Sequence, residues 1–566
     1  MIRLPNQVDL LVIGSGAGGM TAALTGALEG LSVLLVEKCD VLGGTSARSA
    51  GSIWLPNTHL DPNGDDSFDN ALTYLRAAVG NRLNEVRAST FLKTAPDMAL
   101  RLEQEAGLAL RAYPHHPDYL ASLEGATLSG RVLEPEPFDA AILGDRFADI
   151  APPLPEFTLL GGMMVDRVDI DHLLNATKSP KSFLHTAKMV ARYGLDRLQH
   201  RRGRRLVMGN ALIGRLYHAL LNKGVSVAMN VETTNLVSEK GRVVGAELKQ
   251  GDHSHTLSAT IGVVLATGGF SRNSALRQEL CSEHLAGASA VADGATGDGL
   301  YLANSLGGLL SSDHESASFW APVSHRRRPD GSIGVFPHFV LDRGKPGAFA
   351  VGPDGKRFVN EATTYHLWGE ALFAMKSYTG GGACHLICDD AFVERYGIGV
   401  VRPRRIGLKA ALKDRYVIQA DTLEALAKKI DVPPQALTAT AERHARFGES
   451  GVDEDFGKGS DAYQKNLGDP THTPNPCIRG LGAGPFYALE LRPGDIGASA
   501  GLVCDADARV LRADGEAIEG LYACGADMES IMAGRYPGPG ITLGPAMTFG
   551  YLAALHASAL AKGDET

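Results

Sequence analysis

Residues 8–19 read VDLLVIGSGAGG, an apolar run that passes directly into a glycine-rich turn. Residues 20–28 are rich in Ala and Leu, which predicts a helix, and residues 31–36 are apolar and partly β-branched, which predicts a second strand. Strand, turn, helix and strand in this order form a βαβ unit, and such units build parallel sheets. This opening stretch therefore assigns the chain to the α/β class.

The glycine turn has the spacing of a dinucleotide-binding loop, G-x-G-x-x-G, at Gly14, Gly16 and Gly19. Glycines let the backbone approach a pyrophosphate, and the N–H groups at the start of the next helix point at its negative charge. Glu37 ends the following strand, near the ~20-residue spacing expected for an acid that binds a ribose hydroxyl. The loop alone fits NAD as well as FAD. The predicted contacts at this end of the cofactor are Gly14, Gly16, Ala17, Gly18, Gly19, Glu37 and Lys38.

Length and composition narrow the class of protein. The chain has 566 residues, which favours two or three domains, and its net charge of −9 disfavours nucleic-acid binding. No apolar run reaches the ~20 residues of a membrane span, and residues 1–9 lack the pattern of a signal peptide. The seven scattered cysteines fit a reducing cytoplasm, the expected location. Cys384 and Cys388 are expected to be core residues, so no metal is predicted.

The strand-like runs of the chain are split between its two ends. They occur at residues 225–270 and return at residues 485–524, whereas the middle carries no dinucleotide motif. A sheet that starts at one end of the chain and resumes at the other implies an inserted domain. We predict a nucleotide-binding domain in two parts, 1–304 and 483–566, around a substrate domain of residues 305–482, with a helical insertion near 170–205.

Residues 178–205 depart from the acidic average of the chain. They contain nine Lys and Arg residues, interleaved with the apolar Phe183, Leu184, Met189, Val190 and Leu198. Such a basic amphipathic stretch is typical of a helix that lies on an anionic membrane surface. The alternative is a solvated helix face whose cations pair with acidic residues of the same chain. Both interpretations stay open at this point.

Several motifs beyond the first loop resemble the flavoprotein superfamily of fumarate reductases and succinate dehydrogenases. They are residues 43–47 (GGTSA), 265–270 (LATGGF), 296–299 (TGDG) and 522–527 (YACGAD). The resemblance implies a GR2-type flavoprotein, that is, a Rossmann-like FAD-binding domain with an inserted α+β catalytic domain. It also implies that the isoalloxazine lies against residues 43–47 and that the start of a late helix faces it. The further FAD contacts implied are Gly43, Gly44, Thr45, Ser46, Ala47, Ala266, Thr267, Gly268, Asp298, Gly525, Ala526, Gly540, Leu543, Gly544, Pro545 and Ala546.

The mode of FAD attachment follows from the same resemblance. Covalent members of the superfamily attach FAD through a His just after the glycine pair. This chain has Thr45, Ser46 and Ala47 there, so FAD is expected to be bound non-covalently.

Residues 535–551 (RYPGPGITLGPAMTFGY) narrow the resemblance to the 3-ketosteroid Δ1-dehydrogenases. Residues 51–57, 342–347 and 357–361 resemble the same enzymes, so the similarity extends over nearly the whole chain. These enzymes remove a proton from C2 and a hydride from C1 of a 3-oxo steroid, and flavin N5 accepts the hydride. The resemblance thus implies a 3-oxo steroid as substrate and an external electron acceptor, a quinone or another compound.

The resemblance also implies catalytic roles. The steroid carbonyl is held by the Tyr536 hydroxyl and the Gly540 amide, donors of the kind that stabilise developing enolate charge. The base matches Tyr365, and Tyr119 matches the tyrosine that assists it, with the nearby Tyr113 as an alternative. An isolated Tyr has a pKa of about 10, so a hydrogen-bonded pair with basic neighbours is expected to lower it. The chain departs from the family at His366, where other members usually have Asp.

Two other functions remain open on the sequence. One is a related flavin ene-reductase or dehydrogenase that acts on another cyclic ketone, including a 4-ene steroid dehydrogenase, or on a dicarboxylate. The other is a non-catalytic or membrane-adaptor flavoprotein that uses residues 178–205.

Overall fold

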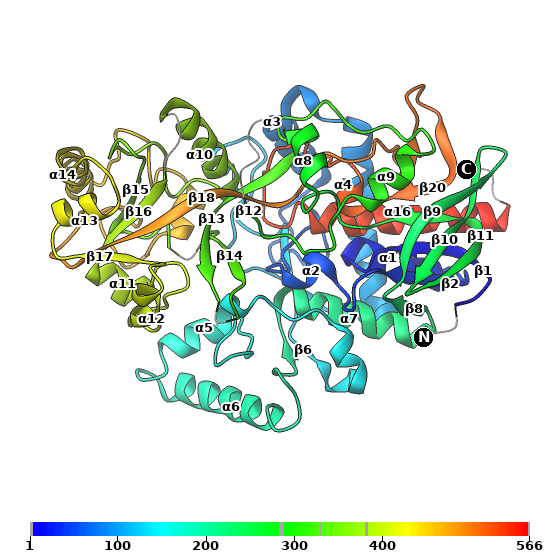
Figure 1. Cartoon of the computed structure of the whole chain (residues 1–566), viewed down its shortest axis with the longest axis horizontal. Helices are drawn as coiled ribbons and strands as arrows, with labels where there is room; N and C mark the ends of the chain where they lie inside the picture. The colour runs from blue at the N-terminus through cyan, green and yellow to red at the C-terminus, as the bar shows by residue number, and fades with distance from the viewer. Residues whose placement is uncertain (1–3, 282–287, 329, 341, 380–382, 564–566) are drawn as a thin grey trace.

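The computed structural model describes residues 4–281, 288–328, 330–340, 342–379 and 383–563. Two large sheets lie in the two halves of an elongated molecule (Figure 1). In the half that contains both chain termini, the strand order is β19-β20-β11-β1-β2-β8, and β10 and β9 continue from β11. These strands are β1 (Gln7–Ile13), β2 (Val33–Glu37), β8 (Ser226–Met229), β9 (Glu232–Glu239), β10 (Arg242–Gln250), β11 (His253–Leu265), β19 (Arg509–Leu511) and β20 (Ala517–Ala523).

The central strands of this sheet are parallel, as the opening βαβ unit predicts. β1 pairs in parallel with β2 on one side and with β11 on the other, and β20 adds in parallel to β11. These central strands are near-continuous apolar runs, as expected where both faces of a parallel sheet are buried. Leu10, Leu11 and Val12 of β1 are fully buried. The carboxyl ends of strands far apart in sequence therefore meet at one edge of the sheet.

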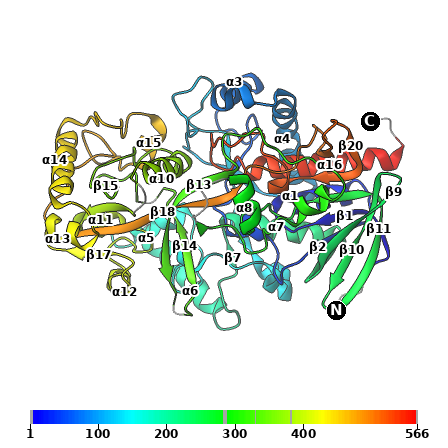
Figure 2. The same ribbon diagram turned by 45° about the horizontal axis from the view of Figure 1, so that its top comes forward.

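Helices α1 (Ala17–Leu28), α7 (Met208–Asn222) and α16 (Leu543–Lys562) pack together beside this sheet (Figure 2). α1 and α16 approach each other closely because small residues line their contact. A Cβ atom on Gly18 would lie 2.8 Å from the Ala546 carbonyl oxygen, and one on Gly550 would lie 2.4 Å from the Gly18 oxygen. The start of the last helix is thereby fixed against the start of the first.

The second sheet has the order β14-β13-β18-β16-β15, with β12 and β17 paired to β18. Its strands are β12 (Ala288–Ser289), β13 (Ser318–Arg327), β14 (Ile333–Pro337), β15 (Ala348–Val351), β16 (Cys384–Asp389), β17 (Ile418–Ala420) and β18 (Phe486–Ala498). Around them lie α10 (Tyr365–Thr379), α11 (Asp390–Tyr396), α12 (Leu408–Lys413), α13 (Leu423–Lys429), α14 (Pro434–Ser450) and α15 (Ala462–Leu467). β12 and β18 lie outside residues 305–482 in the sequence, yet both strands belong to the second sheet. The domain limits at 304 and 483 stay predictions.

The remaining helices and strands lie outside the two large sheets. They are α2 (Gly44–Arg48), β3 (Ile53–Trp54), α3 (Phe68–Val79), α4 (Glu85–Ala106), β4 (Leu110–Ala112), β5 (Val132–Pro135), β6 (Phe138–Asp139), α5 (Arg167–Leu174), α6 (Pro180–Asp196), β7 (Arg205–Leu206), α8 (Ser274–Cys281) and α9 (Asp298–Asn304). α6 starts where the Ser179 side chain caps it and Pro180 takes its first position. α5 and α6 lie at the outer edge of the molecule (Figure 1). Among the described residues, no helix combines the length and hydropathy needed to cross a membrane.

A buried ion cluster holds the segment between β3 and β5. The Arg131 guanidinium donates to both carboxylate oxygens of Asp66, at 3.1 and 2.7 Å, and to Asp118 at 2.8 Å. The Trp54 indole N–H donates to the other oxygen of Asp118 at 2.9 Å. All three charged side chains are 1% exposed. Burial raises the pKa of Asp118, and the positive charge of Arg131 opposes that effect.

We expect the Arg131→Met substitution to destabilise the protein by about 3–5 kcal/mol, because it leaves two buried carboxylates without their cation. Urea unfolding followed by tryptophan fluorescence measures this change. The control is Arg76→Met, which removes a solvent-exposed pair with Glu85 and should change stability little. Equal effects of the two substitutions would contradict a dominant role of burial.

Candidate active site

The predicted glycine loop has the geometry of a pyrophosphate cradle. Gly14 has φ +107°, and a Cβ there would lie 2.1 Å from the Ala266 carbonyl oxygen. A Cβ on Gly19 would lie 2.1 Å from the Gly14 oxygen, so the first and third glycines are required by close backbone contact. A Cβ on Gly16 would meet only the Ser46 hydroxyl, at 3.6 Å. The face at Gly16 is therefore open to a ligand, as the approach of a pyrophosphate requires.

Glu37 and Lys38 lie at the carboxyl end of β2, where the ribose contact is predicted. The Glu37 carboxylate accepts hydrogen bonds from the Ser15 amide at 3.1 Å and the Ser15 hydroxyl at 2.6 Å. The Lys38 ammonium pairs with Asp298 at 2.6 Å. The structure thus brings the predicted Asp298, at the start of α9, against the first βαβ unit.

Asp527 is a buried acid that the predicted set of site residues lacks. Its carboxylate accepts from the Thr267 amide at 2.5 Å, the Thr267 hydroxyl at 2.9 Å and the Gly269 amide at 2.9 Å. Burial raises the pKa of Asp527 to about 6. It fixes the predicted 266–268 turn after β11 against the predicted Gly525-Ala526 pair. The sequence could have predicted Asp527, because it is the last residue of the 522–527 motif.

The predicted isoalloxazine segment, residues 43–47, forms the start of α2. The Ser46 hydroxyl accepts from the Ala17 amide at 3.1 Å, which ties this segment to the glycine loop. The Thr45 hydroxyl accepts from the Ala292 amide at 3.1 Å, and Asn210 donates to the Ala47 carbonyl at 2.6 Å. The segment is therefore held on three sides by hydrogen bonds.

The predicted C-terminal flavin segment interleaves with residues 52–55. Gly540 has φ +88°, and a Cβ there would lie 2.4 Å from the Ser52 oxygen. The Trp54 amide donates to the Gly540 carbonyl at 3.1 Å, and a Cβ on Gly544 would lie 2.2 Å from the Trp54 oxygen. α16 starts at Leu543, and Pro545 stands in its first turn, as predicted. Residues from both ends of the chain thus fit one cofactor site.

The three predicted catalytic tyrosines meet in one buried cluster. The Tyr119 hydroxyl donates to the Tyr365 hydroxyl at 3.2 Å. The Tyr536 ring centroid lies 5.0 Å from that of Tyr365 and 5.9 Å from that of Tyr119. A fourth ring, Tyr463 on α15, lies 4.6 Å from Tyr119. Tyr463 was not predicted, since it stands outside every motif and only the tertiary fold brings it here.

Local contacts fix Tyr119 relative to Tyr536. The Tyr119 amide donates at 2.8 Å to the carbonyl of Pro537, which directly follows Tyr536. The preceding Asp118 belongs to the buried cluster with Arg131 and Trp54. The alternative assistant, Tyr113, packs edge-on against His116 at 5.2 Å. The hydrogen bond to Tyr365 therefore favours Tyr119 over Tyr113 as the residue that assists the proposed base.

Burial controls the acidity of these tyrosines. It raises the pKa of Tyr365 and of Tyr119 well above the usual range, and it also raises that of Tyr536. The Arg343 charge lowers the pKa of Tyr119 against this effect. The expectation that pairing lowers the pKa of the base is therefore wrong for Tyr365 in this protein. Desolvation of the phenolate outweighs the hydrogen bond.

His366 lies behind the cluster. It is buried, and its Nδ1 accepts from the Trp320 amide at 3.1 Å, which leaves the proton on Nε2. Nε2 lies 3.2 Å from the Glu370 carboxylate, and the His366 ring lies 6.1 Å from the Tyr536 ring. The residue that departs from the family thus lies on α10, near Tyr536.

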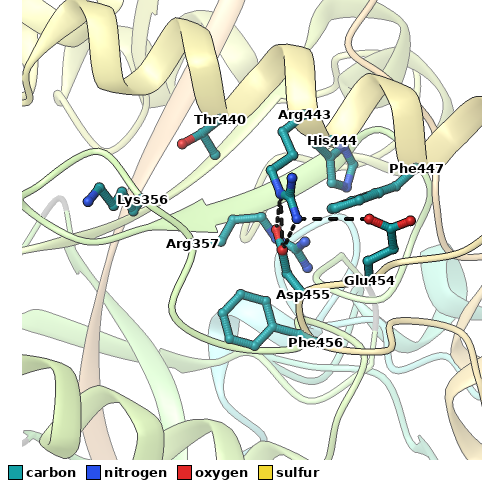
Figure 3. A pocket seen from close by; sticks show the side chains of 9 residues that line it. All are labelled: Lys356, Arg357, Thr440, Arg443, His444, Phe447, Glu454, Asp455 and Phe456. Atoms are coloured by element: carbon teal, nitrogen blue, oxygen red, sulfur yellow. Dashed lines mark hydrogen bonds and ion pairs between the residues drawn. The ribbon is translucent and has the colours of Figure 1, made fainter.

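A separate hollow of about 420 Å³ lies beside α14 (Figure 3). Arg443 pairs there with Asp455 at 2.6 Å, and the Arg357 and Arg443 guanidinium carbons lie 5.1 Å from the ring centres of Phe456 and Phe447. None of the predicted site residues lines this hollow. In the described part of the chain, no group of three or more His, Cys, Asp or Glu residues could hold a metal ion.

Comparison with known proteins agrees with this geometry. A family model described as FAD binding domain matches residues 9–543. The chain is 37% identical to a 3-oxosteroid 1-dehydrogenase of Mycolicibacterium smegmatis, with 98% of each protein covered. It is 36% identical to a 4-oxocyclohex-2-ene-1-carboxylate 5-dehydrogenase of Sinomonas cyclohexanicum, over 98% of this chain and 95% of that one.

A solved structure is similar over the same extent. It is the 3-ketosteroid delta1-dehydrogenase from Sterolibacterium denitrificans in complex with 1,4-androstadiene-3,17-dione, with a TM-score of 0.90 and 37% identity over 98% of this chain and 100% of that one. The predicted fold class and the prediction of FAD as cofactor are thereby confirmed. This chain belongs to the family of flavoproteins that share the FAD binding domain.

Proposed function

We propose that this FAD-dependent oxidoreductase is a 3-ketosteroid Δ1-dehydrogenase, which forms the C1–C2 double bond of a 3-oxo-4-ene steroid. The observation that carries the proposal is the hydrogen-bonded Tyr119–Tyr365 pair beside Tyr536, next to the predicted flavin segment at Gly540. The names of the relatives from M. smegmatis and S. denitrificans support the same activity.

Tyr536 and Gly540 are the proposed donors to the steroid carbonyl. Within the described part of the chain, the Gly540 amide donates to no other group, and its positive φ turns it away from the neighbouring strand pairing. Removing a proton next to a carbonyl places negative charge on the carbonyl oxygen. Two fixed donors in a dry site stabilise that charge without reorganisation.

Tyr365 is the proposed base for the C2 proton, and Tyr119 donates a hydrogen bond to its oxygen. This donation stabilises the Tyr365 phenolate, the form that accepts the proton. FAD, when bound, supplies an acceptor for the C1 hydride, and Thr45, Ser46 and Ala47 favour its non-covalent binding. An external acceptor, a quinone or another compound, would then regenerate the cofactor.

The aromatic rings around the cluster favour an uncharged ketone over a carboxylated one. Phe319 and Phe339 pack edge-on against Tyr536 and Tyr365 at 5.0 and 4.9 Å. Burial lowers the pKa of His116 to about 4, so this neighbour of Tyr119 is neutral at pH 7. The donors of the buried Arg343 are bonded to backbone carbonyls. The carboxylate of a 4-oxocyclohexanecarboxylate would thus have to displace these carbonyls to bind the guanidinium.

The first test is turnover of a 3-oxo-4-ene steroid by the holoenzyme with an artificial electron acceptor. We expect the 1,4-dien-3-one, identified by mass spectrometry and by the position of the new double bond. 4-Oxocyclohexanecarboxylate and fumarate serve as comparison substrates. Turnover of either, without any steroid product, would overturn the proposal.

The second test separates the tyrosines. We expect Tyr365→Phe to lower kcat by about a hundredfold to ten-thousandfold, as for loss of a general base, and Tyr536→Phe by about a hundredfold to a thousandfold. Tyr119→Phe should cause a smaller loss, and the control Tyr113→Phe should leave kcat unchanged. Flavin absorbance reports whether each variant retains FAD. If Tyr113→Phe lost more activity than Tyr119→Phe, the assignment of the assistant would be reversed.

A second proposal concerns location: we infer that α6 contacts the surface of a membrane. Phe183, Leu184, Leu195 and Leu198 are 64%, 69%, 68% and 80% exposed, so apolar side chains of this helix and the residues after it face outward. The inward cations of the 178–205 stretch are held by the chain itself, Arg204 by Asp196 at 2.8 Å and Arg205 by Asp169 at 2.7 Å.

The outward cations complete the argument for α6. Within the described residues, Lys181 and Lys188 form no ion pair with an acidic side chain. An exposed apolar face with free cations fits an anionic lipid surface, whose apolar and charged layers match both features. The two sequence interpretations of residues 178–205 thus apply to different faces of the same segment.

Liposome flotation tests this contact. We expect the holoenzyme to float with vesicles that contain phosphatidylglycerol, and the combined substitution of Phe183, Leu184, Leu195 and Leu198 by Ser to abolish flotation. Lys181→Glu with Lys188→Glu should weaken binding only to anionic vesicles. The control, Val452→Ser, changes an apolar residue that is 60% exposed elsewhere. Equal flotation of all variants would contradict the proposal.

A further inference from the structure

Arg343 is a buried cation without an acidic partner. Its side chain is fully buried, and its Nε donates to the carbonyls of His338 at 2.9 Å and Phe339 at 3.0 Å. Its two Nη atoms donate to the carbonyls of Phe339, Glu361 and Thr363. Among the described residues, no carboxylate lies within ion-pair distance of this guanidinium. A fixed positive charge thus stays uncompensated inside the protein.

The neighbouring carboxylates, those of Asp342 and Glu361, bind groups other than the Arg343 guanidinium. Asp342 accepts from His338 Nδ1 at 2.7 Å and from the Gly399 amide at 3.0 Å. The Glu361 carboxylate binds Arg357 at 2.8 Å and Lys458 at 3.3 Å, so only its backbone carbonyl serves Arg343. The fold therefore keeps both acids away from the guanidinium.

The segment that carries Arg343 packs against the tyrosine cluster from two sides. The ring of Phe339, whose carbonyl Arg343 holds, lies 4.9 Å from the Tyr365 ring. A Cβ on Gly344 would lie 2.7 Å from Leu467 on α15, the helix that carries Tyr463. The Tyr463 hydroxyl is buried. Burial raises the pKa of Tyr463 to about 12, and the Arg343 charge lowers it.

The other titratable groups around the cluster supply no fixed positive charge. Tyr536 faces Tyr119 and Tyr365, and His116 and His366 approach at ring distances of 6.3 Å from Tyr119 and 6.1 Å from Tyr536. Asp461 acts on Tyr463 from the start of α15 and raises its pKa. A tyrosinate in the cluster thus has Arg343 as its counter-charge.

We propose that Arg343 is a positioning residue of the base, whose unpaired charge allows the cluster of Tyr119, Tyr365 and Tyr463 to hold a tyrosinate. The inference rests on the proposed dehydrogenation. In that step the C2–H bond breaks and its proton neutralises the tyrosinate, while the C2 electron pair forms the C1=C2 bond as hydride leaves C1 for FAD. Release of the tyrosine proton to solvent restores the charged form.

Ultraviolet difference titration of tyrosine in the holoenzyme tests the charge without any turnover. We expect one tyrosine titration of the wild type to be lost in Tyr365→Phe or Tyr119→Phe, which assigns it to this pair. In Arg343→Met this titration should move up by about 1–3 pH units, the effect of one opposite charge at close range. Arg343→Lys, which keeps the charge, should retain most of the effect.

The pH profile of kcat gives the second readout. The rate should rise with pH as the base loses its proton, and Arg343→Met should move this limb to higher pH. At a fixed pH below the limb, kcat should then fall by about tenfold for each pH unit that the limb moves. The control Arg87→Met removes another buried Arg, one paired with Glu529, and should move neither curve.

These experiments test the role of the Arg343 charge independently of the identity of the substrate. A merely structural Arg343 would lower kcat or stability at unchanged tyrosine titration and unchanged pH dependence, which would overturn the proposal. If Arg343→Met does not fold, Arg343→Gln takes its place: an unchanged tyrosine titration and an unchanged pH dependence of kcat in that variant would also overturn the proposal. Absence of steroid turnover would affect only the proposed substrate, because the titration needs none.

Discussion

Backbone contact between α1 and α16 is the constraint on which the site depends. Gly18 faces the carbonyl of Ala546, and Gly550 faces the carbonyl of Gly18, at distances that leave no room for a side chain. Helices normally keep 8–10 Å between their axes, and only small residues allow a closer approach. This contact fixes the last helix of the chain on the first. The pyrophosphate cradle at Gly16 and the flavin segment at Gly540 consequently belong to one rigid unit.

Two parts of the proposed catalytic site, Tyr119 and Gly540, are attached to this unit through main-chain hydrogen bonds. The Tyr119 amide donates to the Pro537 carbonyl, and the Gly540 carbonyl accepts from the Trp54 amide. The Asp118–Arg131–Asp66 cluster then prevents the 117–119 turn from moving away. Since these anchors use backbone and buried ions, the phenol hydroxyls stay available for chemistry. Tyr365 is the first residue of α10, which packs against β13 of the second sheet, so the cluster forms only when both halves of the molecule are docked.

How much the sequence could predict depends on whether a signal is local. The glycine loop, Glu37 and the Gly540 segment are local patterns in which spacing determines geometry, and the structure brings all of them to one site. Asp527 lay within a quoted motif and could have been included. Tyr463 and the environment of Arg343 could not, because their roles arise from contacts between segments far apart in the sequence. The direction of the Tyr365 pKa was also wrong, since burial is a property of the fold.

The same burial links specificity to basicity. A site lined by aromatic rings, with a neutral His116, fits the proposed lipid-like ketone better than a charged substrate. That dryness also strengthens every hydrogen bond to a developing oxyanion, which benefits the Tyr536 and Gly540 donors. The same dryness raises the pKa of the tyrosine base, because a phenolate loses its hydration there. A nearby acid would cancel any compensating cation, so the cluster requires a positive charge that backbone carbonyls hold and no carboxylate neutralises. In the proposed role, Arg343 meets this requirement through its place in the fold, which would allow a dry, aromatic site and a tyrosine base to coexist.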